Sequence, residues 1–232
     1  MRQYLVRHGQ SVSNAEGRVQ GRADVPLSSL GVRQAVTLAA WAGAIADEVI
    51  ELWSSPLERA RATAAPIAAA LGLELKVCDE LAELHAGIFQ GHLWADLEAR
   101  FPAEVVRWRS GDPDYAIPGG ESRARLAARG RAALEVLAAR DVRGMIVVAH
   151  GGLLTAALGS LLGGRHPLLL AAAARPFTRL PALDNGSVSV LEWPGPELRA
   201  FNDTTHLAAI GPVASAAAAG ENGGEEPPCQ ET

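Results

Sequence analysis

Residues 5–11 read LVRHGQS, a short apolar run that ends in an arginine, a histidine and a glycine. An apolar run of roughly four to eight residues closed by glycine is typical of a buried strand. In an open α/β sheet, ligands bind outside the carboxyl ends of the strands, which is where Arg7 and His8 would lie. Arg7 suits a phosphate because its guanidinium is always cationic, and His8 can act as a nucleophile, an acid or a base. The alternative interpretation is a strand that ends in two surface polar residues.

The same pattern recurs at residues 145–151, where the most strand-like run of the chain ends in His150 and Gly151. Parallel strands end at one edge of a sheet, so His8 and His150 are predicted to face the same crevice. One histidine alone is more often structural than catalytic, but two in matched contexts favour a shared site.

Strand patterns alternate with helix patterns along the rest of the chain, which predicts an α/β fold with helices on both faces of a mostly parallel sheet. Further strands are expected at residues 49–53, 73–78, 187–192 and 198–201. Helices are expected at residues 28–46, from the Ser54-Ser55-Pro56 cap to Leu71, at 93–100, from the Ser122 cap to Arg140, and at 153–162.

Composition excludes several classes of protein. The 232 residues carry a net charge of −5, and the acidic excess lies mostly after residue 207, so nucleic acid is not an expected partner. Two cysteines cannot form a disulfide framework or a four-cysteine zinc site. No signal peptide or membrane span is evident, so a cytoplasmic protein is expected. Residues 208–232 are rich in Ala, Gly, Glu and Pro, and we expect them to be disordered.

Three further residues suggest a phosphate site. Arg59 lies in the first turn of an expected helix, where the helix dipole disfavours a cation unless an anion binds there. The alternative to an anion site is that Arg59 pairs with Glu58 or is simply exposed to solvent. Asn14 would add a neutral donor. Glu83 is one glutamate among many by itself, but in a cationic crevice it becomes a candidate proton donor for a leaving alcohol.

Other phosphate chemistries lack their residues. No Gly-x-x-x-x-Gly-Lys loop is present, and neither cysteine is followed by the arginine of a cysteine-phosphatase loop. Asp112-Pro113-Asp114 follows no strand and is better interpreted as a turn. Glu83 with His85 could begin a metal site, but too few carboxylates cluster nearby. Histidine is the nucleophile that remains.

Four segments, in order, make the chain resemble the histidine phosphatase superfamily, the phosphoglycerate mutase-like enzymes. They cover about residues 3–207 and read LVRHGQS at 5–11, SSPLERARATA at 54–64, LAE at 81–83 and VVAHGG at 147–152. The resemblance implies a three-layer α/β/α sandwich with a small cap built from insertions. One domain would span residues 1–207, with residues 79–120 as the cap.

The resemblance also implies roles for individual residues. His8 would carry the phosphoryl group, and Glu83 would protonate the leaving oxygen and then help to activate water, so that the catalytic residues are His8, Glu83 and His150. The phosphate-binding residues would be Arg7, Asn14, Arg59, His150 and Gly151, and the residues on the substrate side Gln20, Gly21 and His85. The arginines and a histidine neutralise the phosphoryl charge, so we expect no metal and no cofactor.

Residues 118–122, PGGES, resemble the phosphatase branch of the family, and the expected function is hydrolysis of a small phosphorylated metabolite. Residues 201–207 resemble sugar-phosphate, α-ribazole-phosphate and phosphoserine phosphatases without choosing among them. The alternatives are a phosphoglycerate mutase and an inactive phosphate-binding module of the same fold. A homodimer is left open.

Overall fold

The computed structural model describes residues 1–163, 166–171 and 183–210. Within these ranges the chain forms one six-stranded sheet with the strand order β3-β2-β4-β1-β5-β6. The four strands from β3 to β1 run parallel, whereas β5 is antiparallel to both of its neighbours. The strands are β1 (Arg2–Arg7), β2 (Glu51–Ser54), β3 (Leu75–Val77), β4 (Gly144–Ala149), β5 (Val188–Glu192) and β6 (Glu197–Asp203).

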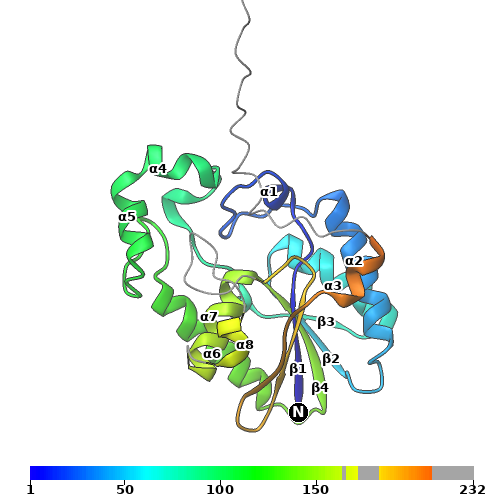
Figure 1. Ribbon diagram of the computed structural model, residues 1–232. Helices are drawn as coiled ribbons and strands as arrows, with labels where there is room; N and C mark the ends of the chain where they lie inside the picture. The colour runs from blue at the N-terminus through cyan, green and yellow to red at the C-terminus, as the bar shows by residue number, and fades with distance from the viewer. Residues whose placement is uncertain (164–165, 172–182, 211–232) are drawn as a thin grey trace, which may run out of the picture.

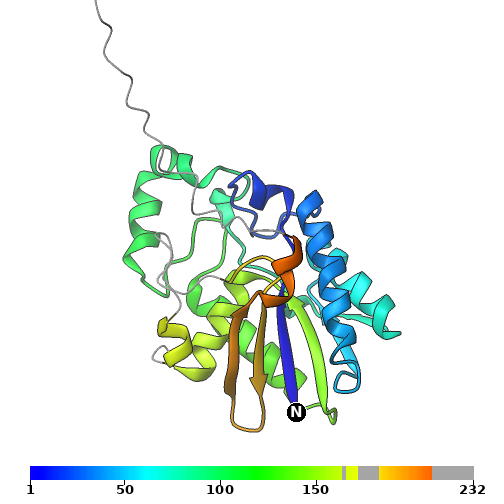
Figure 2. The ribbon, with the colours of Figure 1, turned by 45° about the vertical axis from the view of Figure 1, so that its right-hand side comes forward.

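Helices cover both faces of this sheet, which confirms the expected α/β/α layers (Figure 1). On one face lie α2 (Ser29–Gly43) and α3 (Glu58–Leu71), and on the other α6 (Arg123–Ala138) and α7 (Gly151–Leu162). The turned view in Figure 2 shows the same separation. The shorter helices are α1 (Val12–Ala15), α4 (Leu97–Arg100), α5 (Pro102–Ser110) and α8 (Pro167–Ala171), with 3-10 turns η1 (Asp79–Leu81), η2 (Gly87–Phe89), η3 (Trp94–Asp96) and η4 (Thr205–Ile210).

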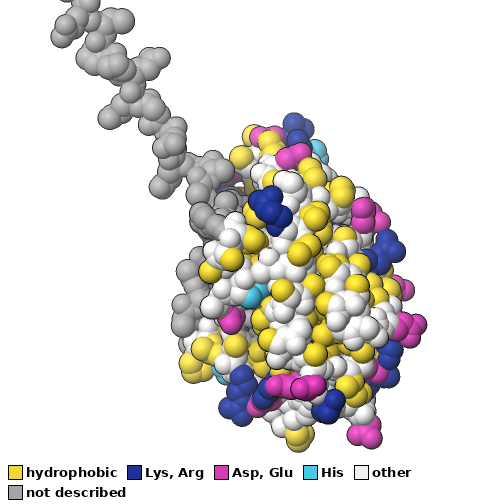
Figure 3. Space-filling view, turned by 90° about the vertical axis from the view of Figure 1, so that its right-hand side faces the viewer, with side chains coloured by type: hydrophobic (Ala, Val, Ile, Leu, Met, Phe, Trp, Pro, Cys, Tyr) yellow, Lys and Arg dark blue, Asp and Glu magenta, His cyan; other side chains and the backbone are white. Residues whose placement is uncertain are grey.

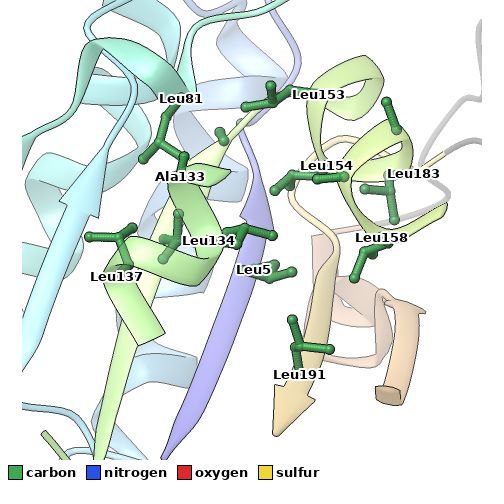
Figure 4. Close-up of a cluster of buried hydrophobic side chains, with 14 of the residues drawn as sticks. Leu5, Leu81, Ala133, Leu134, Leu137, Leu153, Leu154, Leu158, Leu183 and Leu191 are labelled. Carbon is green, nitrogen blue, oxygen red and sulfur yellow. The ribbon is translucent and has the colours of Figure 1, made fainter. Parts of the chain in front are cut away.

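The alternation of β1 explains how the sheet serves two cores. Successive side chains of a strand point to opposite faces. Tyr4 and Val6 therefore pack with the α2 and α3 side chains, whereas Leu5 packs with α6 and α7. Figure 4 shows Leu5 in this second core, together with Leu134 of α6 and Leu154 of α7. All six residues of β4 are buried, because this strand lies inside the sheet and is covered on both faces.

The register of β1 and β4 brings the two His-Gly pairs together. Arg7 lies opposite Ala149 in the parallel ladder, so His8 and His150 follow adjacent strands at the same edge. The predicted common edge is confirmed.

The start of α3 differs from the prediction. Instead of a Ser54-Ser55 cap with Pro56 in the first turn, the helix begins at Glu58 and Leu57 is its N-cap. Ser54 belongs to β2, and the Ser55 hydroxyl is used elsewhere, as described below. The first amide of the helix donates instead to Asp24 Oδ1, at 2.6 Å.

Two other segments also differ from the prediction. The helix expected at residues 93–100 is a 3-10 turn followed by the short α4, and α5, which we did not predict, begins directly after it with Pro102 at its first position. Proline is favoured there because the first amides of a helix have no partner within it. Residues 208–210 belong to η4 rather than to a disordered tail, and the prediction for residues 211–232 lies outside the described residues.

Figure 3 shows the side of the molecule that carries α2, with hydrophobic side chains dispersed over it and charged ones mainly around its top, right-hand and lower margins. Two of the exposed apolar side chains, Val32 and Val36, belong to α2. None of the helices in the described ranges combines the length and the apolar character needed to cross a membrane.

Candidate active site

The His8 ring is buried and held in one orientation by the backbone of Gly9 and the side chain of Arg59. Its Nδ1 lies 2.7 Å from the carbonyl oxygen of Gly9, and its Nε2 lies 3.2 Å from Nε of Arg59. A carbonyl oxygen can only accept a hydrogen bond, so the proton of the neutral ring is on Nδ1. The lone pair of Nε2 therefore accepts the hydrogen bond from Nε of Arg59, and Nε2 is the ring nitrogen that could act as a nucleophile.

Arg59 is buried, with 1% of its surface exposed, although it lies in the first turn of α3. Its guanidinium donates to the carbonyl oxygens of Gly21, at 2.9 Å, and Ala23, at 2.8 Å. Gly21 has φ +55°, and a Cβ there would lie 2.6 Å from the side-chain oxygen of Gln90. Glycine at position 21 therefore suits both the left-handed backbone and the close packing of this loop against Ala86 and Gln90.

His150 is the fully buried N-cap residue of α7. Its Nε2 lies 2.7 Å from the hydroxyl oxygen of Ser55, which also accepts a bond from the amide of Leu57, at 3.3 Å. The hydroxyl proton is thus available to Nε2, and the ring proton is then on Nδ1. This Nδ1 is buried and has no hydrogen-bond partner among the described residues. His150 can consequently offer a donor to an anion, and its ring centroid is 5.1 Å from that of His8.

Both histidines are held in the neutral form. Burial lowers the pKa of His8 well below its usual value, and the charges of Arg59 and Arg7 lower it further. The pKa of His150 is also far below its usual value, because of burial first and then the charge of Arg59. At neutral pH His8 is therefore an uncharged imidazole, the form that can act as a nucleophile.

Arg7 and Gly151 lie against each other at the ends of β1 and α7. One Nη of Arg7 donates to the carbonyl oxygen of Leu183. A Cβ at position 151 would lie 3.2 Å from Nε of Arg7, so a larger residue there would press on the guanidinium. Gly151 thus leaves room for the arginine.

Glu83 lies at the N-terminus of α7. Its carboxylate accepts hydrogen bonds from the backbone amides of Leu84, Gly152 and Leu153, at 2.8, 3.0 and 2.9 Å. The positive end of the helix dipole also favours a carboxylate at this place. Glu83 is close enough to Arg59 for its charge to raise the pKa of that guanidinium, against the larger lowering effect of burial.

Asn14 is joined to the backbone of His8 by Asn185, a residue that the sequence analysis did not single out. The side-chain amide of Asn185 donates to Oδ1 of Asn14, at 3.0 Å, and to the carbonyl oxygen of His8, at 3.1 Å. Oδ1 of Asn14 also accepts from the amide of Ser11, which orients the Asn14 amide. The only signal in the sequence is the Asn185-Gly186 pair before a strand, which marks a turn and not a role.

The two remaining predicted residues are placed differently. Gln20 lies beside the same loop, with its Oε1 2.7 Å from the hydroxyl oxygen of Ser11. His85 is bonded within its own segment, because its Nδ1 accepts from the amide of Gly87, at 3.3 Å. The backbone amide of His85 donates to Glu121. No hydrogen bond among the described residues connects the His85 ring to His8 or Arg59.

No three His, Cys, Asp or Glu side chains in the described part of the chain group as they would around a metal ion. The groups that surround Nε2 of His8 are arginines, a second histidine and backbone amides. Such a set of donors can bind a phosphoryl group by positioning and by charge neutralisation.

The sequence model of the histidine phosphatase superfamily (branch 1) matches residues 3–204. The chain is 37% identical over 167 residues to glucosyl-3-phosphoglycerate phosphatase of Mycobacterium tuberculosis, covering 68% of this chain and 74% of that protein. It is 38% identical over 155 residues to the metal-independent phosphoserine phosphatase of Arabidopsis thaliana, covering 66% and 65%. It is also 37% identical over 165 residues to a probable phosphoglycerate mutase of Photorhabdus laumondii, covering 69% and 74%.

Among solved structures, that of the mycobacterial glucosyl-3-phosphoglycerate phosphatase complexed with VO3 superposes with a TM-score of 0.73 at 33% identity. The match covers 88% of this chain and 99% of that one. The chain therefore belongs to the histidine phosphatase superfamily. Within that family it is a phosphatase, a phosphoric monoester hydrolase.

Proposed function

We propose that this phosphatase transfers the phosphoryl group of a small phosphorylated metabolite to Nε2 of His8 and then to water. The observation that carries the proposal is the hydrogen bonding of the His8 ring. Nδ1 is occupied by the Gly9 carbonyl, and the lone pair of Nε2 faces Arg59. A neutral imidazole fixed in this tautomer is ready to attack phosphorus without first losing a proton.

In the first step the bond between Nε2 of His8 and phosphorus forms while the bond between phosphorus and the ester oxygen breaks. The leaving oxygen keeps the electron pair and takes the proton of Glu83, which enters this step as the neutral carboxylic acid and leaves it as the carboxylate. Arg7, Arg59 and Nδ1 of His150 surround the phosphoryl oxygens and neutralise their charge. Asn14 adds a hydrogen bond from the neighbouring loop, and Gln20 and Gly21 lie toward the substrate.

In the second step water attacks the phosphorus, and the bond to Nε2 breaks with return of the electron pair to His8. The Glu83 carboxylate accepts the proton of the water, and inorganic phosphate leaves. The positive charge comes from side chains of the chain itself, so the reaction needs no metal ion.

We also propose that residues 1–207 form one catalytic domain in which residues 79–120 are a cap that selects the substrate. A hydrophobic cluster separate from the two cores beside the sheet supports this assignment. Apart from Val19, its buried members come from this segment: Ala86, Phe89, Leu97, Val105, Trp108, Tyr115 and Ile117. Since this cap has its own core, its residues can vary without altering the sheet.

A screen for phosphate release tests the proposal. The panel contains phosphoserine, glucosyl-3-phosphoglycerate, 3-phosphoglycerate, sugar phosphates and α-ribazole phosphate, each assayed with the intact chain and with His8→Ala. We expect at least one metabolite to be hydrolysed by the intact chain and none by the variant. Equal phosphate release by both proteins would contradict the assignment of His8.

A phosphoglycerate mutase is the second candidate, and the match to a protein named as a probable mutase favours it. A mutase must shield its phosphohistidine from water while the intermediate reorients. With 3-phosphoglycerate and trace 2,3-bisphosphoglycerate, we expect release of inorganic phosphate to exceed formation of 2-phosphoglycerate. Isomerisation that outruns phosphate release by about a hundredfold would favour the mutase.

A further inference from the structure

Glu83 lies in a segment with no regular secondary structure. Residues 82–86 join η1 to η2 and belong to neither a helix nor a strand. The backbone carbonyls of such a segment need partners from outside it, because no ladder or helix provides them. Arg129, which lies on α6, provides most of these partners, and Nε of Arg22 provides one more, to the carbonyl oxygen of Glu83 at 3.1 Å.

Arg129 uses every N–H group of its guanidinium in this contact. One Nη donates to the carbonyl oxygens of Glu80 and Ala82, at 2.6 and 2.8 Å. The other Nη donates to the carbonyl oxygen of Glu83, at 3.4 Å, and to the carboxylate of Glu121, at 3.0 Å, while Nε donates to the same carboxylate at 3.1 Å. A guanidinium has five donors in a planar fork, and all five are engaged.

Glu121 holds the same segment from the other side. Its backbone amide donates to the carbonyl oxygen of His85, at 2.8 Å, and its carboxylate accepts from the amide of His85, at 3.4 Å. Although burial opposes it, the hydrogen bonds and charge of Arg129 hold the pKa of Glu121 below its ordinary value. The carboxylate therefore stays ionised, and its side chain is only 9% exposed.

From this geometry we propose that Arg129, paired with Glu121, is a positioning residue that fixes the backbone of Glu83 so that its carboxylate reaches the leaving oxygen. The inference rests on the proposed role of Glu83 as the general acid. Arg129 acts through Glu83 because its hydrogen bonds end on the carbonyl oxygens of residues 80, 82 and 83, and on Glu121. Lysine has three donors and no planar fork, so it cannot replace this contact.

The test compares two substrates that differ in their need for an acid. Glycerol 1-phosphate has an alkoxide leaving group that must be protonated, whereas p-nitrophenolate leaves without help. For Arg129→Lys we expect kcat/KM to fall about ten- to hundredfold with glycerol 1-phosphate, and by no more than about threefold with p-nitrophenyl phosphate. Arg131→Lys is the matched control, since Arg131 lies on the same helix and pairs with Glu135 at the surface.

A double-mutant cycle with Glu83→Gln distinguishes the positioning role of Arg129 from the general-acid role of Glu83. In the Glu83→Gln background, Arg129→Lys should have no further effect on glycerol 1-phosphate. If Glu83→Gln discriminates between the substrates but Arg129→Lys lowers both equally, or lowers activity further in that background, the positioning role is wrong. If Glu83→Gln itself does not discriminate, Glu83 is not the acid and the inference fails with it. If Arg129→Lys does not fold, Glu121→Gln weakens the same contact between Arg129 and Glu121 and should also lower kcat/KM more with glycerol 1-phosphate than with p-nitrophenyl phosphate. Equal losses on both substrates would again refute the positioning role.

Discussion

Gly152 offers a way to move the Glu83 carboxylate without removing it. A Cβ at position 152 would lie 2.6 Å from Oε1 of Glu83 and 3.1 Å from its Cδ. Ordinary van der Waals contact begins near 3.4 Å, so in Gly152→Ala Oε1 must retreat by about 0.8 Å. Because the carboxylate ends a flexible side chain, we expect it to move and the backbone to stay.

The cost in stability should be small. The displaced carboxylate loses its hydrogen bonds from the amides of Gly152 and Leu153, which are now 3.0 and 2.9 Å long. Each such bond to a charged group is worth about 1.5–3 kcal/mol, but water replaces part of it, and alanine in a helix gains about 0.5–1 kcal/mol over glycine. We expect a net loss of at most about 2 kcal/mol, or about 4–8 °C in Tm.

The loss in activity should be large and selective. A displacement near 1 Å in a catalytic group can lower the rate about a hundredfold. We expect kcat/KM of Gly152→Ala to fall about thirty- to hundredfold with glycerol 1-phosphate and much less with p-nitrophenyl phosphate. Gly43→Ala is the control, because Gly43 ends α2 and a Cβ there meets nothing within 4 Å. Equal losses on the two substrates would refute the placement of the acid.

Three other perturbations test separate parts of the structure. Ser55→Ala removes the hydroxyl that fixes the His150 ring, so kcat/KM should fall about tenfold with good and poor leaving groups alike; a loss confined to poor leaving groups would contradict this. Glu51, bonded to Arg140 and Lys76, has a pKa lowered from 4.5 to about 2, chiefly by Arg140. Its contribution to stability is therefore present above pH 4.5 and lost as the pH falls toward 2. Glu51→Gln should destabilise the protein by about 1–2 kcal/mol at neutral pH, a figure that allows for the solvent screening of its partly exposed partners. In this variant the free energy of unfolding should depend less on pH between pH 4.5 and 2. Activity should survive EDTA, and loss of activity that added Mg²⁺ or Zn²⁺ restores would show that a metal is required.

The sequence predicted the parts of the fold that rest on strong local patterns. The runs that end in His8 and His150 are buried strands, and their apolar character and closing glycines were sufficient to place both histidines at one edge. The Ser122 cap of α6 was also correct, since its hydroxyl accepts from the amide of Arg125. These features depend on residues close together in the chain.

The features that the sequence did not predict depend on contacts between distant segments. Asp24, which lies 34 residues before Glu58 in the sequence, accepts the first amide of α3, and the Ser55 hydroxyl bonds to His150 instead. The side chain of Asn185 donates to Asn14, and Arg129 of α6 donates to the irregular segment that contains Glu83. Each of these side chains has an ordinary local context, so only the folded chain reveals what it contacts.

The most direct test of the account is to identify the atom that carries the phosphoryl group during turnover. The enzyme is mixed with a substrate that it is known to hydrolyse, and the reaction is quenched in alkali within milliseconds. The phosphorylated residue is then located by mass spectrometry. We predict a phosphoryl group on His8, stable in alkali and lost in acid, and absent from His8→Ala. A phosphoryl group on any other residue, or normal turnover of His8→Ala, would contradict the central claim.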